Sequence, residues 1–492
     1  MFKRTLLAAT LACAFPYATP ALAVSDADLA AEVAKIRAEF DQKLKDIQAA
    51  YEARLKEVEG RQQAVAAAPA APEARQDKLG TVGSGSSFNP QMSVILEGMY
   101  YADSRRGGGV EMLEHIDGIN HSHDHEGHSH GAIERGFNLR ATEVAFSATV
   151  DPYFDANLML TVDSGGGVEV EEAYFDTRAL PAGWKIRGGK FLSGIGYLND
   201  QHPHTWDFAD QNLAYRTLLG EHGIMDTGLQ FTWRPRTGSV YTLLGVEMLQ
   251  GNEQVFGTAG EETPTAREDG AGLAAGSAGE LAGEKAGPRL MTAFAKFAPD
   301  LGDDHALQIG LWGARANQHQ EVHDHTLEDP ANLVHALQGK SWLWGTDWVY
   351  KYDAPGAYGQ GDLKLTAEYL REIKDMDIAF HENGALVGQS RKFTQDGLYL
   401  AGIYGFAPNW QVGVRYDVTG LTNKLDGPAG NLWEKNDSDR WTLSLTRHFS
   451  EFSRLRLQAS TADLWVEGAP EKVNQFMLQY QHSLGAHGAH KF

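Results

Sequence analysis

The C-terminal stretch, residues 473–492, alternates apolar and polar side chains and stops on an aromatic residue. Phe476, Leu478 and Tyr480 share one phase, Gln475, Met477, Gln479 and Gln481 share the other, and Phe492 ends the chain. Successive side chains of a strand point to opposite faces. An apolar face toward lipid and a polar face toward a wet lumen is typical of the closing strand of an outer-membrane β-barrel. A half-buried strand of a soluble sandwich would look the same, so the rest of the chain has to decide.

The same alternation recurs throughout residues 91–492. In residues 362–370, Leu363, Leu365 and Tyr369 alternate with polar side chains, and residues 341–352 carry aromatics near both ends, as interfacial belts require. The pattern predicts an all-β fold, a transmembrane antiparallel β-barrel of about sixteen strands. The predicted strands are 91–102, 137–150, 154–163, 168–178, 184–196, 224–234, 240–250, 289–298, 305–316, 341–352, 361–373, 393–406, 410–420, 439–449, 452–463 and 473–484.

The connections between these strands alternate in length. Short periplasmic turns and long external loops in strict alternation are typical of single-chain bacterial barrels and are hard to obtain from a soluble sandwich. The short connections are 151–153, 180–183, 235–239, 299–304, 407–409 and 450–451; the long ones include 103–136, 197–223, 251–288, 317–340, 374–392 and 421–438.

The first 90 residues have a different character. Lys3 and Arg4, an apolar run and a small-residue site at 21–23 predict a secretory signal peptide over residues 1–23. Residues 24–63 carry an apolar stripe with spacings of three and four, which predicts a periplasmic coiled-coil helix. Either partner helices cover this stripe, or the helix lies alone on the periplasmic face of the barrel. Residues 64–90 form an Ala/Pro and Gly/Ser linker, and residues 91–492 form the barrel.

Composition excludes several classes of protein. The chain has 43 Lys and Arg against 65 Asp and Glu, a formal net charge of −22, so we expect no nucleic-acid partner. Its one cysteine, Cys13, lies in the predicted signal peptide, which leaves neither a disulfide scaffold nor a cysteine-based zinc site. No nucleophile elbow or phosphate-binding loop is recognisable, and we expect no enzyme.

Histidine clusters in the long connections are the candidate metal ligands. Imidazoles interleaved with carboxylates suit borderline divalent metals, Zn²⁺ above all, as a bound ligand or transported ion rather than a required cofactor. A histidine-rich loop that is merely solvated is the alternative. The candidate ligands are His115, His121, His123, Asp124, His125, Glu126, His128 and His130 in the first long connection, and His319, His323, Asp324 and His325 in a later one.

The third external loop, residues 197–223, is the candidate pore constriction. In porins this loop commonly folds into the lumen, where a cation would exchange water for imidazole and carboxylate. Alternatively, Pro203, Trp206 and Phe208 pack the loop against the wall, with the histidines as hydrogen-bonding neighbours. The candidate constriction residues are Asp200, His202, His204, Asp207, Asp210, Glu221 and His222.

Three stretches carry a family resemblance. The segment GIGYLNDQHPHTWDF at 194–208, the histidine-rich first loop and the ending at 483–492 resemble the zinc-regulated outer-membrane proteins of proteobacteria, often labelled TonB-dependent receptors. The layout is similar to the phosphate-selective porin O/P group. That resemblance implies a bacterial outer-membrane location, with the N-terminal helix in the periplasm. It also implies a homotrimer held by the coiled coil and barrel walls, and delivery to the barrel-assembly machinery through Phe492.

The sequence helps to choose between these labels. A TonB-dependent transporter carries a plug inside a barrel of about 22 strands, whereas only a coiled coil and a linker precede the first strand here, so TonB is not an expected partner. Anion specificity does not fit the acidic composition. We expect a porin for passive uptake of small solutes whose external His/Asp loops gather divalent metal, zinc first. The alternatives are a general or anion-permeable porin with incidental histidines and a non-transporting surface metal-binding protein.

Overall fold

The computed structural model describes Lys45 and residues 90–105, 110, 113, 116, 133–140, 142–162, 166–252, 254–257, 260–267, 270–324, 333–428, 430–434, 436–466 and 468–485. The chain divides into two units, Met1–Val82 and Gly83–Phe492, and the fold below is that of the second. The predicted signal peptide, coiled coil and linker lie outside the described residues, except for helical Lys45 and for Pro90. Among the residues described, no helix is both long and apolar enough to cross a membrane.

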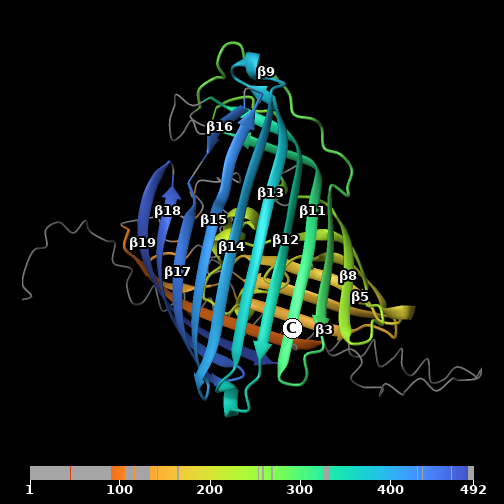
Figure 1. Cartoon of the computed structure of the whole chain (residues 1–492). Coiled ribbons are helices and arrows are strands. Elements are labelled where there is room, and N and C mark those ends of the chain that lie inside the picture. The colour runs from red at the N-terminus through yellow and green to blue at the C-terminus, as the bar shows by residue number, and fades with distance from the viewer. Residues whose placement is uncertain are drawn as a thin grey trace, which may run out of the picture. The chain divides into compact units, whose positions relative to one another are not determined.

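The described part of the second unit is one antiparallel sheet (Figure 1). Its strands are β1 (Gln91–Asp103), β2 (Gly136–Leu139), β3 (Thr142–Thr149), β4 (Phe154–Val162), β5 (Val168–Thr177), β6 (Trp184–Leu192), β7 (Met225–Trp233), β8 (Val240–Leu249), β9 (Ala278–Gly279), β10 (Leu290–Pro299), β11 (His305–His323), β12 (His335–Tyr352), β13 (Leu363–His381), β14 (Ser390–Ala407), β15 (Trp410–Gly427), β16 (Gly430–Glu434), β17 (Ser438–Ser450), β18 (Ser453–Val466) and β19 (Ala469–Gly485).

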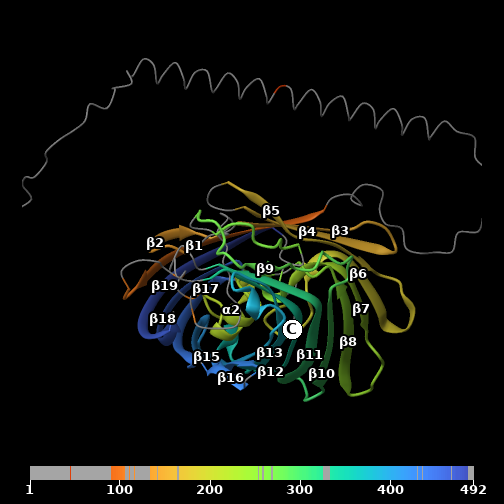
Figure 2. The same ribbon diagram turned by 90° about the horizontal axis from the view of Figure 1, so that it is seen from above.

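The sheet closes on itself. β1 pairs with β19 on one edge, where Tyr101 lies opposite Met477, and with β3 on the other, where Ser93 lies opposite Ala145. Figure 2 shows the resulting ring of strands from above. Of the nineteen described strands, β2, β9 and β16 are short additions to longer neighbours. The other sixteen strands form the barrel, which confirms the predicted fold class.

The two faces of the wall differ as the alternation predicts. On β19, Phe476 and Tyr480 are 42% and 46% exposed, whereas Gln479, on the other face, is 1% exposed. Trp344 and Trp348 of β12 are likewise exposed on the outside. An apolar outer face and a polar inner face are what a barrel surrounded by lipid requires, so this is a transmembrane barrel.

Strands β11, β12 and β13 are longer than predicted. Residues 317–340 and 374–392 were expected to be loops, but β11 continues to His323, β12 begins at His335 and β13 reaches His381. Beyond the lipid both faces of a strand meet water, so the apolar alternation fades while the hydrogen-bonded ladder continues. His319 and His323 therefore lie on a strand, and their predicted placement in a loop was wrong.

Residues 193–224, between β6 and β7, form what we call the third loop. It contains the 3₁₀ turn η3 (Pro203–Thr205) and the helix α2 (Leu213–Leu219), whose first turn is capped by the Asn212 side chain accepting from the Tyr215 backbone N–H. Viewed from above, α2 lies within the ring of strands (Figure 2).

The largest apolar cluster among the described residues joins the third loop to the inner wall. Full burial of one large apolar side chain contributes about 1.5–3 kcal/mol, so a loop with several such residues is a packed element rather than a loose connection. The cluster contains Ile195, Tyr215, Leu218, Leu219 and Ile224 of the loop and Phe294, Trp312, Leu343, Leu370 and Tyr399 of the wall, among others.

Candidate functional site

Asp210 of the third loop lies between two arginines of the inner wall. Its carboxylate oxygens accept from Arg415 of β15 at 2.9 Å and from Arg440 of β17 at 2.7 Å. Asp417 accepts from Arg440 at 2.7 Å and from the Leu213 backbone N–H at 2.9 Å, so two carboxylates balance two guanidiniums. Burial opposes ionisation of Asp210, but the two guanidiniums outweigh it and lower its pKa to about 2.

Strand β18 holds the backbone of the loop. Arg454 donates to the carbonyl of His204 at 2.7 Å, and Arg456 donates to the carbonyl of Trp206 at 2.9 Å. Both arginines point inward, because they lie in the polar phase of β18, opposite to that of Leu455 and Leu457. Guanidiniums bound to carbonyl oxygens fix the path of the loop without specifying its side chains.

Glu368 of β13 holds the other end of the loop. One carboxylate accepts from the backbone N–H groups of Tyr197 at 2.8 Å and Leu198 at 3.0 Å. It also accepts from the hydroxyls of Tyr215 at 2.8 Å and Tyr399 at 2.5 Å. Four donors satisfy this buried carboxylate, so it acts as a structural anchor inside the barrel.

Histidines and glutamates meet where the third loop crosses β3 and β5. His202 Nε2 lies 2.9 Å from Glu172 and its Nδ1 lies 3.6 Å from Glu171, while His204 Nδ1 lies 2.5 Å from Glu143. The two imidazoles are stacked with centroids 5.9 Å apart. Burial opposes protonation of His202, but Glu171 and Glu172 outweigh it and raise its pKa well above the usual value.

The remaining predicted constriction residues are spread over the loop. Asp207 pairs with Lys364 of β13 at 2.7 Å, and Glu221 pairs with Arg216 at 3.3 Å. His222 is exposed and Asp200 is half-buried. The structure therefore brings His202 and His204 together with glutamates and Asp210 together with arginines, and does not gather the predicted set into one ring.

A row of three histidines crosses the far ends of β11, β12 and β13. His323 lies opposite His335 in the strand register, and His335 lies opposite His381. Their rings are stacked, with centroids 5.0 Å and 5.7 Å apart. Only His323 of this row was predicted as a ligand.

Next to this row, Glu321 joins several side chains of the same region. It lies 2.6 Å from His319 Nε2 and 3.1 Å from His323 Nε2, and it also pairs with Lys374. Asp324 is buried. The remaining predicted ligands, His115, His121, His123, Asp124, His125, Glu126, His128, His130 and His325, lie outside the described residues.

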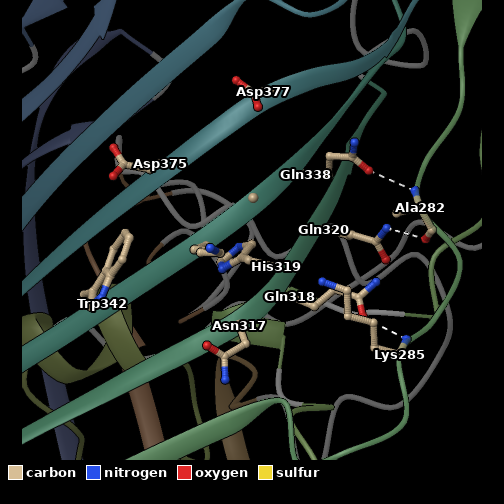
Figure 3. Close-up of a pocket in the computed structure, with 12 residues that line it drawn as sticks. Ala282, Lys285, Asn317, Gln318, His319, Gln320, Gln338, Trp342, Asp375 and Asp377 are labelled. Carbon is tan, nitrogen blue, oxygen red and sulfur yellow. Dashed lines mark hydrogen bonds between the residues drawn. The ribbon is translucent and has the colours of Figure 1, made fainter.

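A pocket of about 500 Å³ lies beside the same three strands (Figure 3). Residues 282–285 form one side, where Gln338 accepts from the Ala282 backbone N–H at 2.8 Å and Gln318 from that of Lys285 at 2.9 Å. Trp342 and Asp375 line the other side and share a strand face with the exposed residues of the outer wall. The pocket therefore belongs to the outside of the barrel rather than to its lumen.

Glu143, Glu172, His335 and His381 were not among the sequence candidates. Glu171 and Glu172 interrupt the alternation of β5, and the pairing register shifts there, between Met159 and Leu160 of β4. That interruption was the sequence signal for the two glutamates of β5. No sequence signal pointed to the histidine row, because cross-strand neighbours depend on a register that spacing along the chain does not reveal.

Sixteen antiparallel strands, closed around an inward-folded loop and apolar on the outside, define a porin-like transmembrane β-barrel. An uncharacterized protein of Aquifex aeolicus (strain VF5) is 32% identical to this chain over 414 residues, which cover 83% of this chain and 81% of the relative. The chain belongs to one family with that protein. No model of a known protein family matches the chain.

Solved structures show similar folds at low identity. The outer membrane channel DcaP of Acinetobacter baumannii is 11% identical with a TM-score of 0.45, over 82% of this chain and 100% of that chain. OprB of Pseudomonas putida is 12% identical with a TM-score of 0.44, over 80% of this chain and 94% of that chain. An anion-selective porin from Comamonas acidovorans is 10% identical with a TM-score of 0.41, over 80% of this chain and 99% of that chain. The resemblance to zinc-regulated outer-membrane proteins stays a prediction.

Proposed function

We propose that the protein is an outer-membrane porin through which small hydrophilic solutes diffuse past the third loop. The observation that carries this proposal is the position of that loop: it lies inside the barrel, and charged residues of the inner wall hold it there. A loop fixed in this way narrows a wide barrel to a selective passage.

The inner wall differs in exposure around the barrel. Inward residues near the loop, such as Asp417 and Gln458, are buried. Ser147 and Asn157 lie opposite each other on β3 and β4, on the same face as Glu143, and are partly exposed. This difference favours a passage along β3, β4 and β5, on the side of the lumen that the loop covers least.

Single-channel conductance of the refolded protein in planar bilayers tests the porin function. We expect discrete openings from the unmodified protein. In D210N the loop loses a charged anchor, so we expect a larger or noisier current. D463N is the matched control, because Asp463 is exposed and pairs with the exposed Lys472. A protein that inserts but conducts no current, with or without D210N, is not a porin.

The same proposal includes metal at the external mouth, where loop histidines and carboxylates gather divalent ions, zinc first. The stacked row of His323, His335 and His381 supports it, because three imidazoles are gathered next to Glu321. Several weak sites rather than one tight site would let ions enter and leave. Zinc is then a transported ligand, not a required cofactor.

Titrating Zn²⁺ from the external side during the conductance measurement tests this part. We expect micromolar Zn²⁺ to alter the current. Replacing His121, His123, His125, His128 and His130 with Ser should abolish that response. A large current that ignores both Zn²⁺ and these substitutions identifies a general porin. Zinc binding without any current identifies a surface metal-binding protein.

A further inference from the structure

A second group of side chains that could hold a metal ion lies inside the barrel, on other strands than the histidine row. Glu143 of β3, Glu171 of β5 and His202 of the third loop each place one ligand atom within 4.8 Å of the others. The three residues come from segments far apart in sequence, and the path of the third loop brings them together.

Two polar atoms of this group lack a hydrogen-bond partner. His202 Nδ1 and Glu171 Oε2 are buried atoms for which the described residues supply no hydrogen bond. A buried polar atom left unpaired costs about 1–3 kcal/mol. Two such atoms on adjacent side chains indicate that something else satisfies them.

Glu172 orients the imidazole of His202. One of its oxygens lies 2.9 Å from His202 Nε2, and the other accepts from the Leu192 backbone N–H at 2.8 Å. When Nε2 carries the proton and donates to Glu172, the lone pair of Nδ1 faces Glu171, 3.6 Å away. A carboxylate that holds the second nitrogen of a histidine in this way is the usual support of a metal-binding imidazole.

The charge of the cluster also calls for a cation. Glu143, Glu171 and Glu172 contribute three carboxylates, which lie against the imidazoles of His202 and His204. Arg140 donates to Glu97 at 2.7 Å. The carboxylates outnumber the imidazoles, so the cluster has an excess of negative charge that a divalent ion would offset.

We infer that Glu143, Glu171 and His202 bind one divalent first-row transition-metal ion in the lumen, beside the third loop. The site deepens the proposed function, and its role in transport rests on that function. One imidazole and two carboxylates suit Zn²⁺, Co²⁺ or Mn²⁺ better than Ca²⁺ or Mg²⁺, which prefer oxygen ligands alone. The side chains of His202 and Glu171 are 13% and 14% exposed, so an ion in the lumen reaches them.

Metal binding to the refolded full-length protein in detergent tests the site without any measurement of current. The background protein carries Ser in place of His121, His123, His125, His128 and His130, which removes the first-loop ligands. Co²⁺ absorption in the visible region reports imidazole and carboxylate coordination, and calorimetry with Zn²⁺ gives the stoichiometry. Ca²⁺ serves as the comparison ion.

E171Q and H202Q are the test variants. H305Q is the matched control, because His305 is exposed and contacts Tyr350 at the start of β11, a strand that carries none of the three proposed ligands. We expect each test variant to bind one ion fewer per chain, or to bind it at least about tenfold more weakly, the lower end of what loss of a supporting partner costs. H305Q should bind like the background. Heat-modifiable electrophoretic mobility confirms that each variant is folded.

Equal Co²⁺ spectra and equal Zn²⁺ stoichiometry in E171Q, H202Q and H305Q would overturn the site. The site would also be overturned if the background protein binds no ion and H202K folds as stably as its parent. The permanent cation of the lysine would then replace an imidazolium of His202 that merely pairs with the glutamates. Absence of current together with stoichiometric binding leaves the site intact and rejects only the porin function.

Discussion

Buried charged residues determine where the third loop lies. Asp210 has four polar partners on three strands, including Arg415, Arg440 and Gln458, and Glu368 accepts from four donors. Removing one member of a buried ion pair costs about 3–5 kcal/mol, because the other charge is left uncompensated. Single residues of the wall therefore control the position of a long loop.

The D210N substitution should destabilise the barrel in a pH-dependent manner. The folded-state pKa of Asp210, about 2, lies below the unfolded value of about 3.9. Its contribution is therefore present above about pH 4 and is lost as the pH falls toward 2. We expect wild type to exceed D210N by about 3 kcal/mol in unfolding free energy at pH 7. Guanidinium unfolding followed by heat-modifiable mobility measures the difference.

D463N provides the baseline for this measurement, since Asp463 is exposed, and it should match wild type from pH 7 to pH 3. A gap between wild type and D210N that is unchanged at pH 2.5 would contradict the assigned ionisation of Asp210.

At the scale of elements, close contact fixes α2 against the wall. A Cβ added at Gly397 of β14 would lie 2.6 Å from Ala214 Cβ and 2.9 Å from its Cα. Glycine is thus required at this position for the helix to approach the strand. The same wall elsewhere tolerates side chains, because a Cβ at Gly98 of β1 meets nothing within 4 Å.

G397V should push α2 away from β14. Overpacking of this kind costs about 1–3 kcal/mol, so we expect a folded barrel of lower stability in which the third loop exchanges backbone amide protons faster. G98V should behave like wild type in both respects. Hydrogen exchange with mass spectrometry measures the loop directly, and unchanged protection of residues 213–219 in G397V would disprove the packing argument.

At the scale of the whole molecule, ring closure and assembly are separate questions. The register of β1 with β19 closes the ring within one chain, so the barrel needs no partner to satisfy its edges. The apolar stripe over residues 24–63 remains to be covered, and we predicted that it associates with the same stripe of two further copies.

Deletion of residues 24–63 tests this assembly. We expect the full mature protein to have the mass of a trimer in detergent and the deletion variant to show a weakened or lost trimer, while its barrel stays heat-modifiable. Light scattering coupled to size-exclusion chromatography measures the mass. If the deletion variant remains as fully trimeric as its parent, the barrel walls alone hold the trimer; if both are monomers, the predicted assembly is wrong.

The sequence by itself determined the class of fold. Alternation along β13, β17, β18 and β19 is a local property, because lipid on one side and water on the other select every second residue. The count of sixteen strands followed from it, and so did the inward direction of Glu368, Arg454 and Arg456. Where that selection ends, as beyond the lipid on β11 to β13, the strand limits were missed.

Only the tertiary structure decided which residues meet. The histidine row depends on the register of three strands, and the group of Glu143, Glu171 and His202 depends on the path of the third loop across the lumen. These positions result from contacts between residues far apart in sequence, such as Asp210 with Arg440. A periodic pattern reports the environment of each residue but not its neighbour across the barrel.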